Sequence, residues 1–273
     1  MSIRPARLAC LRLLAVLGAI ALGPGQVRAG DPHWLDLESR IQYGYYTEDA
    51  RALRNVAESL GAPDSHDRLK SYYVGLMAYR VTLLAEAQAN SSERVPSHNR
   101  KRDSRKHDPS TVEARQEGER CVSALDEALR AQSDFADALA LQSACLDLLA
   151  QVSSSWRTPF AAPKSEAQLH KALQLAPKNP RVLLLEALAA YDHEEAATRS
   201  CEKFKSTAAV FDTERADVDQ VPGWGAAEAY MWLGRCYLEK GDVVPARDAL
   251  ERALLIAPEF VRARRLLSSI TSG

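Results

Sequence analysis

The chain has 273 residues, 46% of them hydrophobic and 26% charged, and its formal net charge is −1 at pH 7. This length suits one elongated domain or one to two compact ones, and the absence of net positive charge disfavours a general role in nucleic-acid binding. Leu and Ala abound, β-branched residues are few and no long stretch alternates as a strand does, so we expect an all-α fold.

Residues 1–29 have the pattern of a secretory signal peptide. Arginines open the chain, an apolar run extends from Leu13 to Leu22, and the small residues Val27 and Ala29 offer a cleavage site. The run is too short for a membrane span, which needs roughly 20 apolar residues. We therefore predict export to the periplasm or the exterior, with a mature chain that begins at Gly30; an uncleaved anchor is the alternative. Cleavage removes four arginines and no acids, which takes the net charge from −1 to −5.

Residues 30–90 are predicted to form an N-terminal helical region. A short apolar-periodic stretch around Trp34 and Ile41 precedes a helix from Thr47 to Leu60, which Gly61 ends. A longer helix follows from about His66 to Ala89, with a buried stripe of Leu and Tyr residues.

Residues 91–109 are interpreted as a flexible basic insertion, because they hold no aromatic residue and a single aliphatic one, Val95. A solvated loop is one interpretation. The other is a basic arm for an anionic surface or an acidic partner. The basic residues of this insertion are Arg94, Arg100, Lys101, Arg102, Arg105 and Lys106.

From residue 110 onward the pattern predicts helices joined by short connections. Ser110 and Glu113 have the spacing of a capping box at the start of the first helix. Asn179 and Pro180 give a later helix a cap and a proline in its first turn. The expected helices before the last hairpin cover about 110–131, 134–151, 165–176, 180–191 and 194–211, and a final helix covers 259–270.

A helical hairpin close to the C-terminus carries the most specific pattern. Gly241 suits the left-handed position that ends a helix, and Asp242 is placed to cap the next one. Gly234 is small enough to let the second helix approach closely, and Pro258 cannot continue that helix. The spacing resembles the tetratricopeptide repeat (TPR), a 34-residue helix–turn–helix unit. The residues that carry the resemblance are Tyr230, Leu233, Gly234, Tyr237, Gly241, Ala246, Leu250, Ala253 and Pro258.

The resemblance implies that residues 110–273 form a right-handed solenoid of TPR-like helical hairpins with a terminal capping helix. It also implies that the protein holds a protein or peptide on a concave face lined by the first helix of each repeat. The alternative is that the residues at these positions pack against neighbouring helices. The matching positions of this sequence are Arg181, Leu184, Leu188, Tyr191, Glu228, Met231, Arg235 and Glu239.

Four cysteines follow the predicted cleavage site, and their spacing suggests two disulfides. Cys121 and Cys145 are equidistant from residue 133, where one hairpin turns, and Cys201 and Cys236 are equidistant from the loop of another. Residues equidistant from the turn of antiparallel helices lie at the same height, so we predict the pairs Cys121–Cys145 and Cys201–Cys236. Four buried thiols are the alternative.

The sequence contains no phosphate-binding glycine loop and no nucleophile elbow. The densest ionisable cluster, residues 192–195, lies between two predicted helices, where helix capping explains it. We therefore predict a binding scaffold without a cofactor or metal rather than an enzyme. Two alternatives stay open: an all-α hydrolase of the cell envelope, which would need a deep pocket with two carboxylates or a Glu of perturbed pKa, and a polyanion-binding adaptor that uses the basic insertion.

Overall fold

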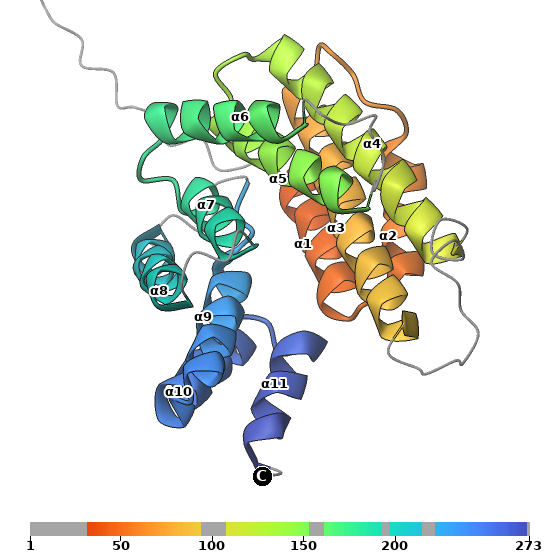
Figure 1. Ribbon diagram of the computed structural model, residues 1–273. Coiled ribbons are helices and arrows are strands. Elements are labelled where there is room, and N and C mark those ends of the chain that lie inside the picture. Colours follow the sequence, from red (N-terminus) through yellow and green to blue (C-terminus); the bar gives the residue numbers. More distant parts are fainter. Residues whose placement is uncertain (1–31, 94–107, 153–160, 193–196, 215–221, 272–273) are drawn as a thin grey trace, which may run out of the picture.

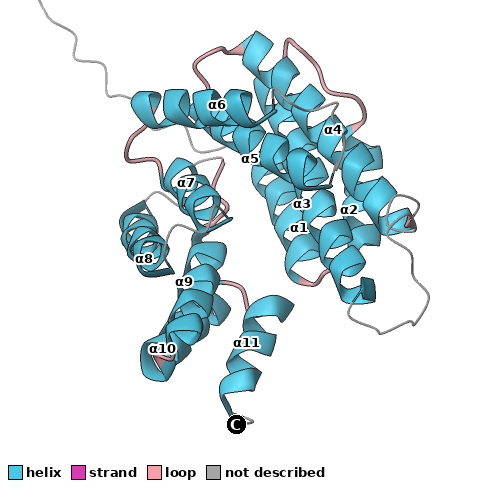
Figure 2. Cartoon of the chain, in the orientation of Figure 1, coloured by secondary structure: helices cyan, strands magenta, loops and turns pink. Residues whose placement is uncertain are grey.

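The computed structural model describes residues 32–93, 108–152, 161–192, 197–214 and 222–271, and these ranges contain helices and turns but no β-strand (Figure 2). The predicted signal peptide, residues 94–107 of the basic insertion and residues 193–195 of the ionisable cluster lie outside the described residues. None of the described helices is long and apolar enough to span a membrane.

The described helices follow the predicted order closely. They are α1 (Pro32–Tyr46), α2 (Ala50–Leu60), α3 (Arg68–Glu93), α4 (Pro109–Ala131), α5 (Ala136–Val152), α6 (Ala161–Leu175), α7 (Pro180–Asp192), α8 (Ala197–Glu214), α9 (Ala226–Lys240), α10 (Val243–Ile256) and α11 (Val261–Thr271).

The helices stack as hairpins in chain order, as Figure 1 shows. Among the first helices, α1 packs on α3, α3 on α5 and α5 on α7, and α9 packs on α11. Each second helix, from α2 to α10, packs on the helix that follows its hairpin. Because every hairpin buries its apolar faces against its neighbours, the fold is the all-α solenoid predicted from the sequence.

Helix ends follow local sequence signals in most places. Gly241 adopts φ 83° at the end of α9, and its N–H donates to the carbonyl of Leu238. The side chain of Asn179 accepts the N–H of Arg181 at the start of α7.

The predicted capping box of Ser110 is wrong in one respect. Asp108 is the N-cap of α4, and its carboxylate accepts the N–H of Ser110 at 3.0 Å. Asp108 takes this place because Pro109 occupies the first helical position, where a missing N–H costs nothing.

The two helices of the α9–α10 hairpin lie as close together as the resemblance implies. A Cβ at Gly234 would lie 2.6 Å from Leu250 Cγ, so only glycine fits without displacing that buried side chain. The interaxial distance of this hairpin is therefore set by the absence of a side chain at one position.

Two apolar clusters form the core. The larger one runs from α1 to α10 and includes Leu76 and Leu125, so it is continuous across the basic insertion. The smaller one joins α9, α10 and α11 and also contains Tyr45 and Tyr46 from the end of α1. Helix α1 therefore contributes residues to both clusters, including the one formed by the last three helices.

Both predicted disulfides are present. Cys121–Cys145 joins α4 to α5 with a Cα–Cα separation of 6.2 Å, and Cys201–Cys236 joins α8 to α9 with 5.6 Å. These separations lie within the range that a disulfide spans. Each bond joins two consecutive helices, as predicted from the equal distances of the paired cysteines from the turn between those helices.

We predict that removing either disulfide lowers the free energy of unfolding by about 2–4 kcal/mol, because each cross-link restricts a loop of the unfolded chain. The paired variant Cys201→Ala/Cys236→Ala, measured by urea denaturation, tests this for the second bond, and Ser123→Ala on an exposed position of α4 is the control. Four free thiols, or a crossed pairing in non-reducing peptide mapping, would contradict the assignment.

Candidate functional site

The first helices of the N-terminal and C-terminal hairpins meet through a buried polar contact. Arg80 of α3 donates to Glu228 of α9, 148 positions away in the chain. Tyr46 of α1 donates its hydroxyl to the other oxygen of Glu228 at 2.6 Å, and Arg80 also donates to Gln42 Oε1 at 3.2 Å. The side chains of Arg80 and Glu228 are each only 3% exposed. With Trp224, these residues form what we call the closure cluster: Gln42, Tyr46, Arg80, Trp224 and Glu228.

Aromatic rings surround the guanidinium of Arg80. Its central carbon lies 4.1 Å from the ring centroid of Tyr45, 4.8 Å from that of Trp224 and 5.7 Å from that of Tyr79. Cation–π attraction of this kind strengthens when the site is dry. The rings therefore offset part of the cost of removing the arginine from water.

The charges of this cluster are held in place by their environment. Burial lowers the pKa of Arg80, but the carboxylate of Glu228 and the neighbouring tyrosines more than reverse this, so the net effect is a raised pKa and a fixed positive charge. Burial and the negative charge of Glu228 raise the pKa of Tyr46 well above its ordinary value, so its hydroxyl stays protonated and donates. The cluster is thus a compensated ion pair.

The turn before α9 is inserted into the same region. Trp224 is 3% exposed, and its indole N–H donates to the hydroxyl of Tyr72 at 2.8 Å. The N–H of Gly223 donates to the carboxylate of Glu38, at 3.0 Å to Oε1. Gly225 has φ 115°, a left-handed value that favours glycine, and a Cβ there would meet Phe211. The turn is therefore fixed by partners on α1 and α3.

Glu38 is the carboxylate that holds this turn, and its pKa is shifted. Burial raises the pKa, and the hydrogen bonds from Gly223 and Tyr73 offset this only in part. The hydroxyl of Tyr73 donates to Glu38 Oε2 at 2.8 Å. Both oxygens of Glu38 are thus engaged inside the chain, which makes this residue an anchor for the turn.

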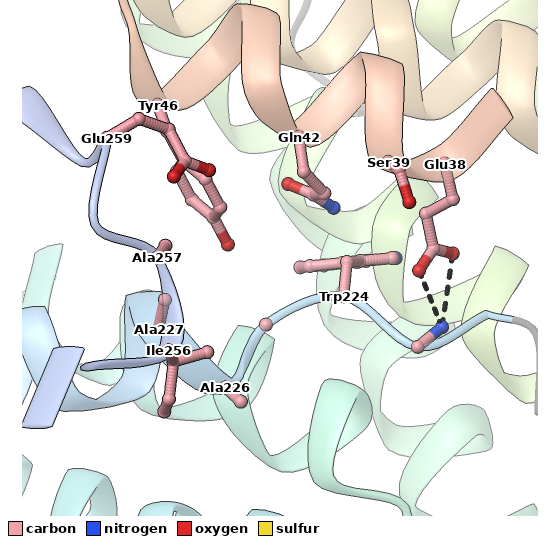
Figure 3. Close-up of a pocket in the computed structure, with 12 residues that line it drawn as sticks. Glu38, Ser39, Gln42, Tyr46, Trp224, Ala226, Ala227, Ile256, Ala257 and Glu259 are labelled. Atoms are coloured by element: carbon pink, nitrogen blue, oxygen red, sulfur yellow. Dashed lines mark hydrogen bonds between the residues drawn. The ribbon is translucent and has the colours of Figure 1, made fainter. Parts of the chain in front are cut away.

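A pocket of about 230 Å³ opens beside the closure cluster, and we call it the α1 pocket. Residues 223–227 form one side, and Ile256, Ala257 and Glu259 form another. Figure 3 shows Gln42 and Glu38 pointing from α1 toward Trp224 and the turn before it. The α1 side of the pocket consists of Glu38, Ser39, Gln42 and Tyr46.

Four of the eight predicted partner-binding residues lie in the interior, which corrects their assignment to an accessible surface. Leu184 and Met231 are fully buried, and Glu228 belongs to the closure cluster. Arg181 is 6% exposed and bonds to Asp137 and Glu214 on neighbouring helices. These residues pack against the chain itself, because α1 and α3 cover the early turns of α9, and α5 and α8 hold the start of α7.

The other four lie on the C-terminal halves of α7 and α9 and stay partly accessible. Tyr191 donates its hydroxyl to Glu239, and Arg235 donates to the same carboxylate at 3.0 Å. Trp232 lies against Tyr191, with 5.3 Å between ring centroids. We call this group the α7–α9 face: Leu188, Tyr191, Trp232, Arg235 and Glu239.

Arg80, Glu38, Gln42 and Trp224 were not predicted from the sequence. Arg80 follows a run of apolar and aromatic residues on α3 and gives no local sign of a distant partner. Trp224, between two glycines, is the strongest signal that was available, because a large aromatic residue in a glycine-rich connection needs a buried site. The described residues contain no group of three or more metal-ligating side chains close enough to hold an ion.

No family model matches this chain, and no curated protein matches it in sequence. Among solved structures it is similar to a thermophilic TPR protein, TTC0263, of Thermus thermophilus, with 14% identity and a TM-score of 0.50 over 88% of this chain and 98% of the other. This likeness concerns the fold, and it confirms the TPR-like solenoid predicted from the sequence.

Two further structures show a weaker likeness. The assembly chaperone of RpL4 (Acl4) has 16% identity and a TM-score of 0.36 over 88% of this chain and 94% of the other. The APC/C hetero-tetramer Cut9–Hcn1 has 13% identity and a TM-score of 0.29 over 86% of this chain and 48% of the other.

We predict that Glu228→Gln lowers the free energy of unfolding by about 3–5 kcal/mol, because it leaves the buried guanidinium of Arg80 without its counter-charge. Chemical denaturation measures the loss. The control is Arg252→Gln, which breaks a solvent-exposed ion pair with Asp212 and should lower the free energy of unfolding far less than Glu228→Gln does. If both variants lose the same small amount, the closure contact does not stabilise the fold.

A second prediction uses Glu38, whose pKa is raised in the folded state. Such a group binds protons more tightly when folded, so it favours the folded state increasingly as the pH falls. The wild type should therefore gain stability relative to Glu38→Gln as the pH falls from about 8 to below the unfolded-state pKa of about 4.3. Thermal melts of both proteins across this range measure the difference; a difference that is constant or changes in the opposite direction would contradict the burial of this carboxyl.

Proposed function

We propose that this chain is a protein- or peptide-binding scaffold rather than an enzyme. Stacked helical hairpins expose long rows of side chains and hold them rigidly, which suits the capture of an extended segment or a helix. The observation that carries the proposal is the α7–α9 face, where tyrosine, tryptophan and arginine lie together on two first helices. These residue types dominate binding energy at protein interfaces.

The geometry of the α7–α9 face supports recognition. Arg235 lies over both rings, 5.4 Å from the centroid of Tyr191 and 5.0 Å from that of Trp232. Glu239 bonds to both Tyr191 and Arg235. The side chains are thus ordered before a partner arrives, which lowers the entropic cost of binding.

We further propose that the protein works after export, in the periplasm or outside the cell. Two observations support this: the signal-peptide pattern of residues 1–29, and two disulfides, which persist in oxidising compartments. Intact-mass analysis of protein exported by a bacterial host should show a chain that begins at Gly30. Retention of Met1 in a cytosolic product would contradict the proposal.

The enzyme alternative has one observation in its favour. The α1 pocket holds two carboxylates, Glu38 and Glu259, and the pKa of Glu38 is raised, as a hydrolase would need. We favour binding because both oxygens of Glu38 are already engaged by Gly223 and Tyr73 and hold the turn before α9. The polyanion alternative rests on the basic insertion and stays a prediction.

Photo-crosslinking tests the scaffold proposal. A photoreactive phenylalanine analogue at position 191 should capture a defined partner from an envelope extract, whereas the same group at Lys205, exposed on α8, should not. Equal capture at both positions would contradict the proposed face.

The captured partner then allows a matched comparison of variants. Arg235→Glu should weaken binding by tenfold or more, since an arginine at an interface contributes on the order of 2 kcal/mol. Its melting temperature should stay close to that of the wild type, because the residue is partly exposed and its ion pair lies within its own helix. Arg247→Glu, on an exposed position of α10, should change neither quantity.

A further inference from the structure

Two arginines from different helices lie beside the indole ring of Trp232. The guanidinium carbon of Arg235, on α9, is 5.0 Å from the centroid of that ring, and that of Arg262, on α11, is 5.1 Å from it. The ring itself is fixed by stacking on the buried ring of Phe204, with 11° between the two planes. Because one ring holds both guanidinium groups, they are neighbours, and we call Arg235 and Arg262 the arginine pair.

Most hydrogen-bond donors of the arginine pair are unused. Arg235 donates from Nε to Glu239 Oε1, and its two terminal nitrogens have no acceptor in the described part of the chain. Arg262 has neither a hydrogen bond nor an ion pair with any described residue. A guanidinium that lies over an aromatic ring can still donate from the N–H groups at its edge. The pair therefore holds several free donors in a restricted place.

The charges at the arginine pair do not balance. Glu239 pairs with Arg235, whereas no described carboxylate pairs with Arg262. Two positive groups near one ring repel each other, and a partly buried position strengthens this repulsion because the effective dielectric is lower than in water. An anion bound by both guanidinium groups would remove the repulsion and supply the missing acceptors.

The sign and size of the excess charge restrict that anion. One uncompensated positive charge matches a single carboxylate, whose planar oxygens can accept two parallel N–H bonds from a guanidinium. A phosphate group carries a charge of about −1.5 to −2 at pH 7. It would meet repulsion from Glu239, which lies beside Arg235. The pair is therefore better matched to a carboxylate than to a phosphate.

The surface next to the arginine pair is apolar on the side of α7. Tyr191 contacts Trp232, as Arg262 does, so α7, α9 and α11 all contribute to one surface around this indole. Leu188 lies one turn before Tyr191 on α7, and both stay partly accessible. A segment bound across these helices would meet apolar side chains on α7 and guanidinium donors between α9 and α11.

We propose that the arginine pair binds the side-chain carboxylate of an aspartate or glutamate within a partner segment, while an apolar residue next to that acid contacts Leu188 and Tyr191. This inference rests on the proposed function and specifies its partner: a protein segment with an acidic residue beside an apolar one. It adds Arg262, which was not predicted from the sequence, to the residues that recognise the partner.

The test uses the mature chain with its disulfides intact and four short peptides. Three have both ends blocked and carry leucine beside a central glutamate, glutamine or lysine; the fourth is the glutamine peptide with a free terminal carboxylate. Two-dimensional NMR follows the indole N–H of Trp232 and the Nε–H of Arg262 during each titration. The blocked glutamate peptide should shift both signals in a saturable manner, and the other three should shift neither.

Variants then assign the effect to Arg262. Arg262→Gln should weaken the glutamate peptide at least about tenfold, because it removes the cation that lacks a counter-charge. Arg264→Gln is the matched control, since it removes an exposed arginine of the same helix whose bond is to the carbonyl of Pro258, and it should leave the affinity unchanged. Both variants should melt close to the wild type, because neither arginine has a carboxylate partner among the described residues.

Four results would overturn the inference: equal binding of the glutamine peptide, equal binding of the peptide with the free terminal carboxylate, normal binding of the glutamate peptide by Arg262→Gln, or no shift with any peptide. Glu194 and Glu195 follow α7 and lie outside the described residues. Shifts that appear only in the variant Glu194→Gln/Glu195→Gln would assign the pair to this chain's own acids and would also overturn it.

The outcome for the scaffold proposal is read separately. If the captured partner is weakened by Arg235→Glu but binds Arg262→Gln normally, the inference is overturned and the scaffold proposal stands. Failure of the crosslinking at position 191, with the peptide shifts as expected, would count against the scaffold proposal alone.

Discussion

The buried contact between Arg80 and Glu228 is the constraint on which the arrangement of this solenoid depends. A stack of helical hairpins needs only contacts between neighbours, yet here α1 and α3 reach α9 across most of the described chain. Two charges taken out of water are costly unless they are paired and hydrogen-bonded. The pair is viable because Tyr46 and Gln42 add hydrogen bonds and three aromatic rings surround the guanidinium. If α9 moved away from α3, both charges would lose their partners together, so the contact favours one closed arrangement over partly open ones.

Closure decides which side chains are available to a partner. The early turns of α7 and α9 are covered by other parts of the chain, so Arg181, Leu184, Glu228 and Met231 become structural. The later turns of the same helices stay accessible and form the α7–α9 face. The acidic α1 pocket lies between the closure cluster and the turn from α10 to α11. The proposed recognition therefore takes place on surfaces that stay accessible after four of the eight predicted binding positions pack against the chain itself.

The local features of the fold were predictable from the sequence, and the long-range ones were not. Helix bounds, the left-handed Gly241 and the close approach at Gly234 depend on neighbours in the chain, and both cysteine pairs lie across adjacent helices, so spacing alone specified them. The partner of Arg80 lies on α9, three hairpins further along the chain, and periodicity carries no information about how far a solenoid curves. For the same reason Glu228 and Arg181 looked like surface charges in a helical pattern, although each has a buried counter-charge.

The closed arrangement of the wild-type chain is tested most directly by a distance measured across it in solution. Nitroxide labels carried on unnatural amino acids can replace Glu58 on α2 and Arg247 on α10, which are both exposed and lie outside the closure cluster. Double electron–electron resonance between them should give one narrow distance distribution that matches the separation in the structure. A broad distribution that extends to longer distances would show that α9 leaves α1 and α3 in solution, and it would contradict the claim that the Arg80–Glu228 contact holds the solenoid closed.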